Sequence, residues 1–130
     1  MRNRTNDEKE QQNFYRKPLE AISNMEPKLQ KAFSLCQKGE TQQAEKICQQ
    51  ILADYPLNAE AIHILGIIAH GENKHNIAVS LIKRAIELDP RQPAFHNNFG
   101  NVLREQGMLD ESAQAYKKAI QLQPNSAEIY

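Results

Sequence analysis

The side chains best suited to chemistry in this chain of 130 residues are its four histidines and two cysteines. His63 and His70 stand seven residues apart, or two turns of a helix, which is too far for them to share a metal ion without other ligands. With His75 and His96, they are interpreted as structural or solvated residues. We therefore expect no metal and no cofactor.

The other reactive residues do not form a catalytic pattern. Their spacing suggests no Ser-His-Asp, Cys-His or paired-carboxylate arrangement, and the glycines are not grouped in a phosphate-binding loop. Cys36 and Cys48 are too few for a disulfide framework and are interpreted as buried or half-buried thiols. The chain by itself is therefore not expected to be an enzyme.

A pair of asparagines offers binding chemistry instead. Asn98 and Asn101, in the stretch HNNFGNVL, are three residues apart, so on a helix they share one face. A carboxamide has an acceptor and two donor hydrogens, enough to pair with both polar groups of a peptide unit. Such a pair would contact the backbone of an extended ligand rather than its side chains. The alternative is that both asparagines are merely solvated.

The segments that must position these residues repeat with a period of 34. Pro56, Pro90 and Pro124 are spaced by this interval, and the residues between them fall into matching columns. One column is small in every unit, which allows two helices to approach closely. It consists of Ala32, Gly66 and Gly100, and a second small column consists of Ala44, Ala78 and Ser112. A bulkier column, which fills the space between helices, consists of Cys48, Ile82 and Tyr116.

Each unit is predicted to be a helix, a turn and an antiparallel helix. Gly39, Asn73 and Gly107 occupy equivalent places, and these residue types tolerate the left-handed conformation that follows a helix. No alternation of period two competes, so the predicted fold class is all-α. The predicted helices span residues 27–38, 41–53, 59–71, 75–88, 93–106 and 109–122.

Small, aromatic and proline residues of the last two units follow one signature. Its members are Leu65, Gly66, Ala78, Ala85 and Pro90, then Phe99, Gly100, Tyr116, Ala119 and Pro124. This signature resembles the tetratricopeptide repeat, which implies a right-handed α-solenoid of tandem helix-turn-helix units. The expected units are 25–58, 59–92 and 93–126. Residues 1–24 are expected to be an N-terminal extension, partly disordered with a short helix, and residues 127–130 to begin a truncated fourth repeat.

The stretch HNNFGNVL is also similar to repeats of O-linked N-acetylglucosamine transferases, in which an asparagine ladder holds the backbone of substrate peptides. The ladder carries over to Asn98 and Asn101, whereas the places equivalent to Asn98 in the earlier units hold Gln30 and Ile64. The wider sequence is similar to bacterial repeat regions that precede glycosyltransferase or sulfotransferase domains.

In the tetratricopeptide family the first helices of successive units line a concave groove, so the resemblance implies that their variable positions meet a ligand. The candidate contacts are Leu29, Phe33, Ile64, Ile67, His63, His70, Asn98 and Asn101. The apolar members would form a patch that soluble monomers seldom leave open. The N-terminal segment, a second copy or a foreign partner would cover it, or else a shifted repeat phase places these residues in ordinary core.

We predict a protein-interaction module that binds a polypeptide in this groove, with the substrate-selecting arm of a larger glycosyltransferase-like protein as one form of it. The alternative is a self-assembling scaffold. The last helix, with Tyr116, Ala119 and Ile120, has no complete following unit to cover its apolar side. A dimer or larger homo-oligomer is therefore expected.

The composition excludes other classes of partner. Sixteen basic and sixteen acidic residues give a net charge of zero and a sequence pI near 6.9, which argues against a nucleic-acid binder. No apolar run approaches the roughly 20 residues of a membrane span, and the start of the chain lacks the apolar core of a signal peptide. A cytoplasmic location without membrane contact is expected.

Overall fold

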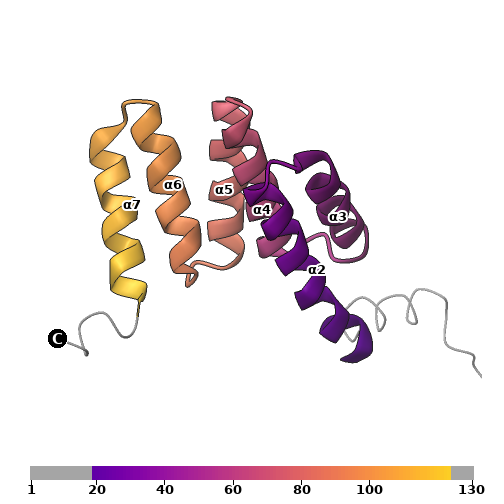
Figure 1. The fold of residues 1–130 in the computed structure, drawn as a ribbon. Coiled ribbons are helices and arrows are strands. Elements are labelled where there is room, and N and C mark those ends of the chain that lie inside the picture. Colours follow the sequence, from indigo (N-terminus) through magenta and orange to yellow (C-terminus); the bar gives the residue numbers. More distant parts are fainter. Residues whose placement is uncertain (1–18, 124–130) are drawn as a thin grey trace, which may run out of the picture.

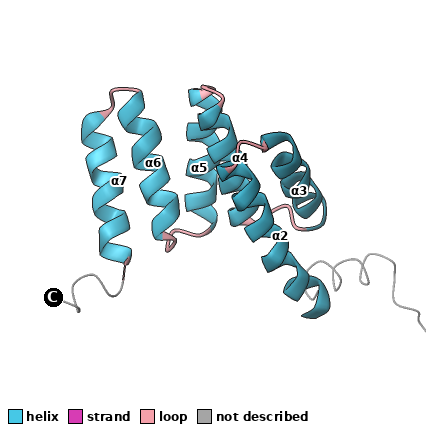
Figure 2. Cartoon of the chain, viewed as in Figure 1, coloured by secondary structure: helices cyan, strands magenta, loops and turns pink. Residues whose placement is uncertain are grey.

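Residues 19–123 are described by a computed structural model, and in this range the chain forms helices and no strand. The helices are α2 (Leu19–Gln37), α3 (Thr41–Asp54), α4 (Ala59–Gly71), α5 (His75–Leu88), α6 (Pro93–Glu105) and α7 (Leu109–Leu122), joined by short loops (Figures 1 and 2). From α3 onward, every helix begins and ends within one residue of its predicted bounds. Most of the predicted N-terminal extension, and all of the predicted fourth repeat at 127–130, lie outside the described residues.

The helices are arranged as three antiparallel hairpins that stand in a row (Figure 1). The closest helix partners are α2 with α3, α4 with α5, and α6 with α7. The first helices of neighbouring hairpins also contact one another, as do α3 with α4 and α5 with α6. The described part of the chain is therefore an all-α solenoid, as predicted.

The first helix is longer than predicted. Helix α2 begins at Leu19 and continues through Pro27, which was expected to start the helix. A proline inside a helix removes one backbone hydrogen bond, and its ring crowds the carbonyl four residues earlier. The residues before Pro27 include good helix formers such as Glu20 and Ala21, and the helix continues on that side of the proline. The predicted short helix near residue 22 is thus part of the first repeat helix.

The turns inside the hairpins have the predicted left-handed residues. Gly39, Asn73 and Gly107 have φ angles of 82°, 62° and 79°. In each turn, the amide of the next residue donates to the carbonyl five residues before it, at 2.8–2.9 Å. This bond satisfies a carbonyl that the end of the helix would otherwise leave unpaired. Asn73 adopts this conformation without the freedom of a glycine, as asparagine does more readily than most residues.

The small column marks the closest approach of the two helices in a hairpin. A Cβ atom built on Gly66 would lie 2.6 Å from Ile82 Cγ1, and one built on Gly100 would lie 2.7 Å from the ring of Tyr116. In the first hairpin the same column holds Ala32, whose side chain is fully buried. In the second and third hairpins the small column therefore packs directly against the bulkier column.

The buried apolar side chains follow the stacking of the hairpins. One cluster joins α2, α3 and α4, and two others each join α4, α5 and α6. Cys48 lies in the first cluster with no exposed surface, and burial raises the pKa of its thiol to about 12. The thiols of Cys36 and Cys48 are both free, in agreement with the sequence interpretation.

We predict that Gly66→Leu lowers the free energy of unfolding by about 1–3 kcal/mol or more, because the new side chain would push Ile82 and α5 away from α4. Urea unfolding followed by circular dichroism measures this change. Gly71→Leu is the matched control, since a Cβ there has no atom within 4 Å, and its effect should stay near 0.5 kcal/mol. Equal losses in the two variants would contradict close packing at Gly66.

Candidate functional site

A shallow depression of about 190 Å³ lies on α2, next to the start of α4. Its lining residues are Glu26, Leu29, Gln30, Phe33, Ser34, Gln37 and Glu60. Phe33 is the large apolar side chain that remains accessible there, with 39% of its surface exposed. The depression therefore combines one accessible aromatic ring with several polar groups.

The predicted apolar patch is only partly present. Phe33 is exposed and Ile67 is half-buried, whereas Leu29 and Ile64 keep 8% and 0% of their surface accessible. Ile64 and Leu29 belong to the core cluster that fills the space between α2 and α4. The prediction that Ile64 contacts a ligand in an open groove thus needs correction, because its side chain packs into the core.

Two carboxylates give the depression a negative charge. Glu26 and Glu60 both line it. The pKa of Glu60 is raised, first by burial of the carboxyl group and then by the negative charges of Glu26 and Asp89. Among the described residues, neither Glu26 nor Glu60 forms an ion pair. A cationic group entering the depression would relieve this unfavourable potential.

The two asparagines are linked in a chain of side-chain hydrogen bonds that crosses three helices. Tyr116 Oη on α7 donates to Asn101 Oδ1, and Asn101 Nδ2 donates to Asn98 Oδ1 at 3.4 Å. Asn98 Nδ2 then donates to His63 Nε2 on α4 at 2.9 Å. Each carboxamide nitrogen uses one of its two hydrogens in this chain, so one hydrogen on each remains to be donated.

An uninterrupted asparagine ladder is not formed along the first helices. Asn98 and Asn101 are half-buried, and Gln30, one equivalent of Asn98, is exposed beside the depression. Between them the equivalent position is taken by Ile64 in the core. Side-chain amides that could hydrogen-bond to the backbone of a ligand therefore lie at two separate places, one on α2 and one on α6.

His63 is a neutral core residue. Its side chain is 2% exposed, and its ring lies on Phe95 with 4.4 Å between the ring centroids. Burial lowers the pKa of the imidazole to about 4. Because Nε2 accepts from Asn98, the proton of the neutral ring is on Nδ1, which is buried and has no hydrogen-bond partner within residues 19–123. His63 is thus placed to hold α4 and α6 together rather than to contact a partner directly.

His70 takes part in a second contact between hairpins. Its Nε2 lies 2.6 Å from Oε2 of Glu105, and the His75 ring lies close by. Sequence reasoning missed Glu105 and His75 as neighbours of His70. A signal was available, because His63 with Asn98 and His70 with Glu105 are both separated by 35 residues, one repeat plus one residue.

No helix within residues 19–123 is long and apolar enough to cross a membrane. The cytoplasmic location and bacterial source expected from the sequence stay predictions.

Comparison with known families supports the repeat architecture. Sequence models described as "Tetratricopeptide repeat" match residues 28–58, 59–92 and 81–114, and a model described as "TPR repeat" matches residues 100–130. The chain belongs to the tetratricopeptide repeat family. As an array of these repeats it is a module for protein–protein interaction, of a type that is not itself catalytic.

Similar proteins carry such arrays within larger chains. Over 112 residues the chain is 32% identical to the protein O-mannosyl-transferase TMTC1 of Mus musculus, a match that covers 83% of this chain and 12% of the relative. An O-GlcNAc transferase mutant of Thermobaculum terrenum superposes with a TM-score of 0.71 and 31% identity, covering 81% of this chain and 20% of that chain. The chain therefore spans a small part of these proteins.

A third similar structure is that of a smaller protein. The Yersinia enterocolitica type III secretion chaperone SycD, in complex with a peptide of the translocator YopD, superposes with a TM-score of 0.67 and 21% identity. The match covers 82% of this chain and 81% of that chain. At this identity the likeness shows a shared fold.

We predict that His63 makes the array less stable in acid. Its folded-state pKa of about 4 lies below the ordinary value of about 6.5, so between these values the unfolded chain binds a proton that the folded chain does not. The free energy of unfolding should therefore fall by about 2 kcal/mol between pH 7 and pH 4.5 through this residue alone.

The measurement is urea unfolding of the wild type and of His63→Gln at both pH values. The variant lacks the titrating ring, so its loss of stability on acidification should be smaller by that amount. An equal fall in the free energy of unfolding of the two proteins between pH 7 and pH 4.5 would show that His63 gains no proton when the chain unfolds.

Proposed function

We propose that this array binds an extended polypeptide across the depression on α2 and α4, with an apolar side chain against Phe33 and a basic side chain near Glu26 and Glu60. The proposal rests on one observation: the accessible ring of Phe33 lies beside two carboxylates that form no ion pair among the described residues. Aromatic side chains that become fully desolvated on binding often carry a large share of the binding energy of protein interfaces.

The electrostatics of the depression favour a basic ligand. The raised pKa of Glu60 shows that the folded protein disfavours its charged form. A lysine or arginine of the ligand would reverse that preference and would be steered toward the site by the same negative charge. Gln30 and Ser34, which also line the depression, offer hydrogen bonds to the ligand backbone.

The asparagines on α6 extend this proposal along the array. Asn98 and Asn101 each keep one amide hydrogen that is free to donate to a carbonyl of an extended ligand. Their other hydrogen bonds fix the orientation of both carboxamides, so little side-chain entropy would be lost on binding. Binding of a peptide by the similar chaperone SycD supports a polypeptide ligand for this fold.

We further propose that the array selects polypeptides for a larger transferase-like protein. This rests on the similarity to the O-mannosyl-transferase TMTC1 and to an O-GlcNAc transferase, both of which extend well beyond the matched region. Backbone contacts by the asparagines would accept many sequences, with a preference set by the depression on α2, which suits an enzyme that modifies several protein substrates.

A self-assembling scaffold is the second candidate function. Leu109 and Ile120, near the two ends of α7, are each 63% exposed and lie on a similar side of the helix, because eleven residues make about three turns. In this alternative α7 meets another copy of the chain. Light scattering over a wide range of protein concentration separates the two functions, because only the scaffold requires a mass that rises with concentration.

We predict that Glu60→Gln weakens peptide binding without destabilising the fold. Removing a carboxylate whose charged form is disfavoured should leave the free energy of unfolding unchanged or higher, while the basic ligand loses an attractive charge. The probe is an array of random peptides, from which sequences with a basic residue next to an apolar one should be enriched.

The affinity of enriched peptides should fall about fivefold to tenfold in Glu60→Gln and should fall further in Phe33→Ala. Glu111→Gln, which removes an equal charge from the exposed start of α7, is the control and should bind as the wild type does. Enrichment of acidic peptides, or equal losses in Glu60→Gln and Glu111→Gln, would reject the proposed site.

A further inference from the structure

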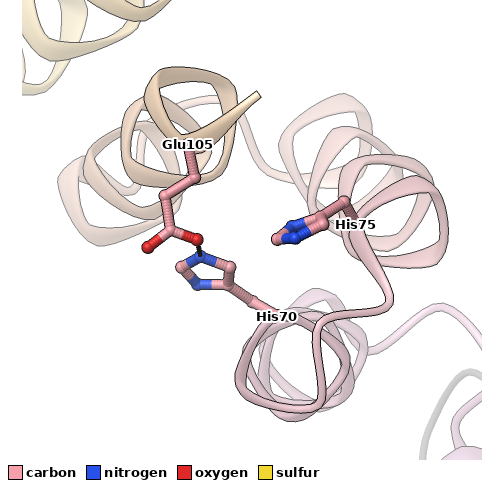
Figure 3. Close-up of side chains that lie close together, drawn as sticks. All are labelled: His70, His75 and Glu105. Atoms are coloured by element: carbon pink, nitrogen blue, oxygen red, sulfur yellow. Dashed lines mark hydrogen bonds and ion pairs between the residues drawn. The ribbon is translucent and has the colours of Figure 1, made fainter. Parts of the chain in front are cut away.

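Three side chains that can ligate metal ions meet at one end of the second and third hairpins (Figure 3). His70 lies in the last turn of α4, His75 is the first residue of α5, and Glu105 is the last residue of α6. One ligating atom from each residue lies within 4.8 Å of the other two. We propose that His70, His75 and Glu105 bind a divalent transition-metal ion of the Zn²⁺ type, which links the second hairpin to the third.

Two separate features of the fold bring these three residues together: the turn between α4 and α5, and the packing of α4 on α6. The turn after α4, with Asn73 in the left-handed conformation, reverses the chain and places the rings of His70 and His75 with their centroids 6.1 Å apart. The stacking of α4 on α6 then brings Glu105 to His70, 35 residues earlier in the chain. The site therefore depends on both the turn and the repeat length.

The distances require only small side-chain movements. Zinc binds imidazole nitrogen and carboxylate oxygen at about 2.0–2.2 Å, so ligand atoms in a tetrahedral site are about 3.3–3.5 Å apart. Here Nε2 of His70 and Oε2 of Glu105 are 2.6 Å apart, and no pair of ligating atoms in the cluster exceeds 4.8 Å. Because the histidines are half-buried and Glu105 is exposed, changes of roughly 1 Å can occur by side-chain rotation.

The donor set selects the class of ion. Two imidazoles and one carboxylate are suited to zinc and neighbouring transition metals, whereas calcium and magnesium prefer oxygen ligands alone. Three protein ligands leave a fourth tetrahedral position for a water molecule or for a side chain of a bound partner. The ion would therefore be held at the surface, where a partner could reach it.

His75 is the member of the cluster whose Nδ1 has no hydrogen-bond partner among the described residues. The contact between His70 and Glu105 accounts for two of the three residues. The His75 ring faces this pair, and its Nδ1 is buried. A metal ion gives all three residues a common partner.

The direct test is a Zn²⁺ titration of the untagged 130-residue chain, followed by long-range ¹H–¹⁵N NMR of its imidazole rings. The chain has four histidines, so each ring can be followed separately. We expect the signals of His70 and His75 to move together, with one ion bound per chain, while those of His63 and His96 stay unchanged. Movement of His63 or His96 instead, or no movement in excess Zn²⁺, would overturn the proposal.

Variants can distinguish a metal site of three ligands from a hydrogen-bonded pair of His70 and Glu105 alone. His75→Gln leaves that pair intact but removes one ligand, so the affinity for Zn²⁺ measured by calorimetry should fall at least about tenfold. His96→Gln is the matched control, because the His96 ring is engaged with the carbonyl of Pro90 at 2.8 Å and should not affect Zn²⁺ binding.

Thermal unfolding gives a second readout. Zn²⁺ should raise the melting temperature of the wild type and of His96→Gln, and this rise should be largely lost in His75→Gln. A Zn²⁺-dependent rise that persists in His75→Gln, or that is lost in Cys36→Ser, would place the ion elsewhere and reject the site.

Discussion

The structure depends on how closely the two helices of a hairpin approach at the small column. At Gly66 and Gly100 there is no space for even one more carbon atom, because Ile82 and Tyr116 occupy it. This contact fixes the rotation of the first helix about its axis, and therefore which of its residues face the next hairpin. The contacts of His63 with Asn98 and of His70 with Glu105 both follow from that rotation. Packing inside a hairpin thus determines which polar side chains contact one another between hairpins.

Most of the fold could be predicted because its signals are local and repeated. A left-handed turn residue, a small column and a proline link recur every 34 residues, and each has one simple physical meaning. The start of α2 was predicted eight residues too late, because Pro27 was treated as a helix start, whereas the helix continues through it. A rule about one residue cannot weigh the helix-forming tendency of the segment before it.

The candidate site was predicted less well, because it depends on contacts between hairpins. Asn98 was expected to offer both its acceptor and its donors to a ligand backbone, yet side chains on α4 and α6 already use part of that capacity. Ile64 was assigned to an open groove, whereas the stacking of α2 on α4 buries it. Of the four apolar candidates in the first helices, Phe33 is the one whose side chain is exposed, at 39% of its surface. Both errors come from treating each first helix separately, without the offset of 35 residues that relates neighbouring first helices.

Because of that offset, the number of residues between these contacts is more tightly constrained than the identity of the residues that form them. The two contacts between α4 and α6 lie seven residues apart on each helix, so both form only if the helices advance in step. A substitution at one position would change one contact and leave the other in place. An inserted residue between Asn98 and Glu105 would turn the rest of α6 by about 100° relative to α4, so the two contacts could no longer exist together. An exchange at one of the four contact residues should therefore be tolerated better than an insertion or deletion between them.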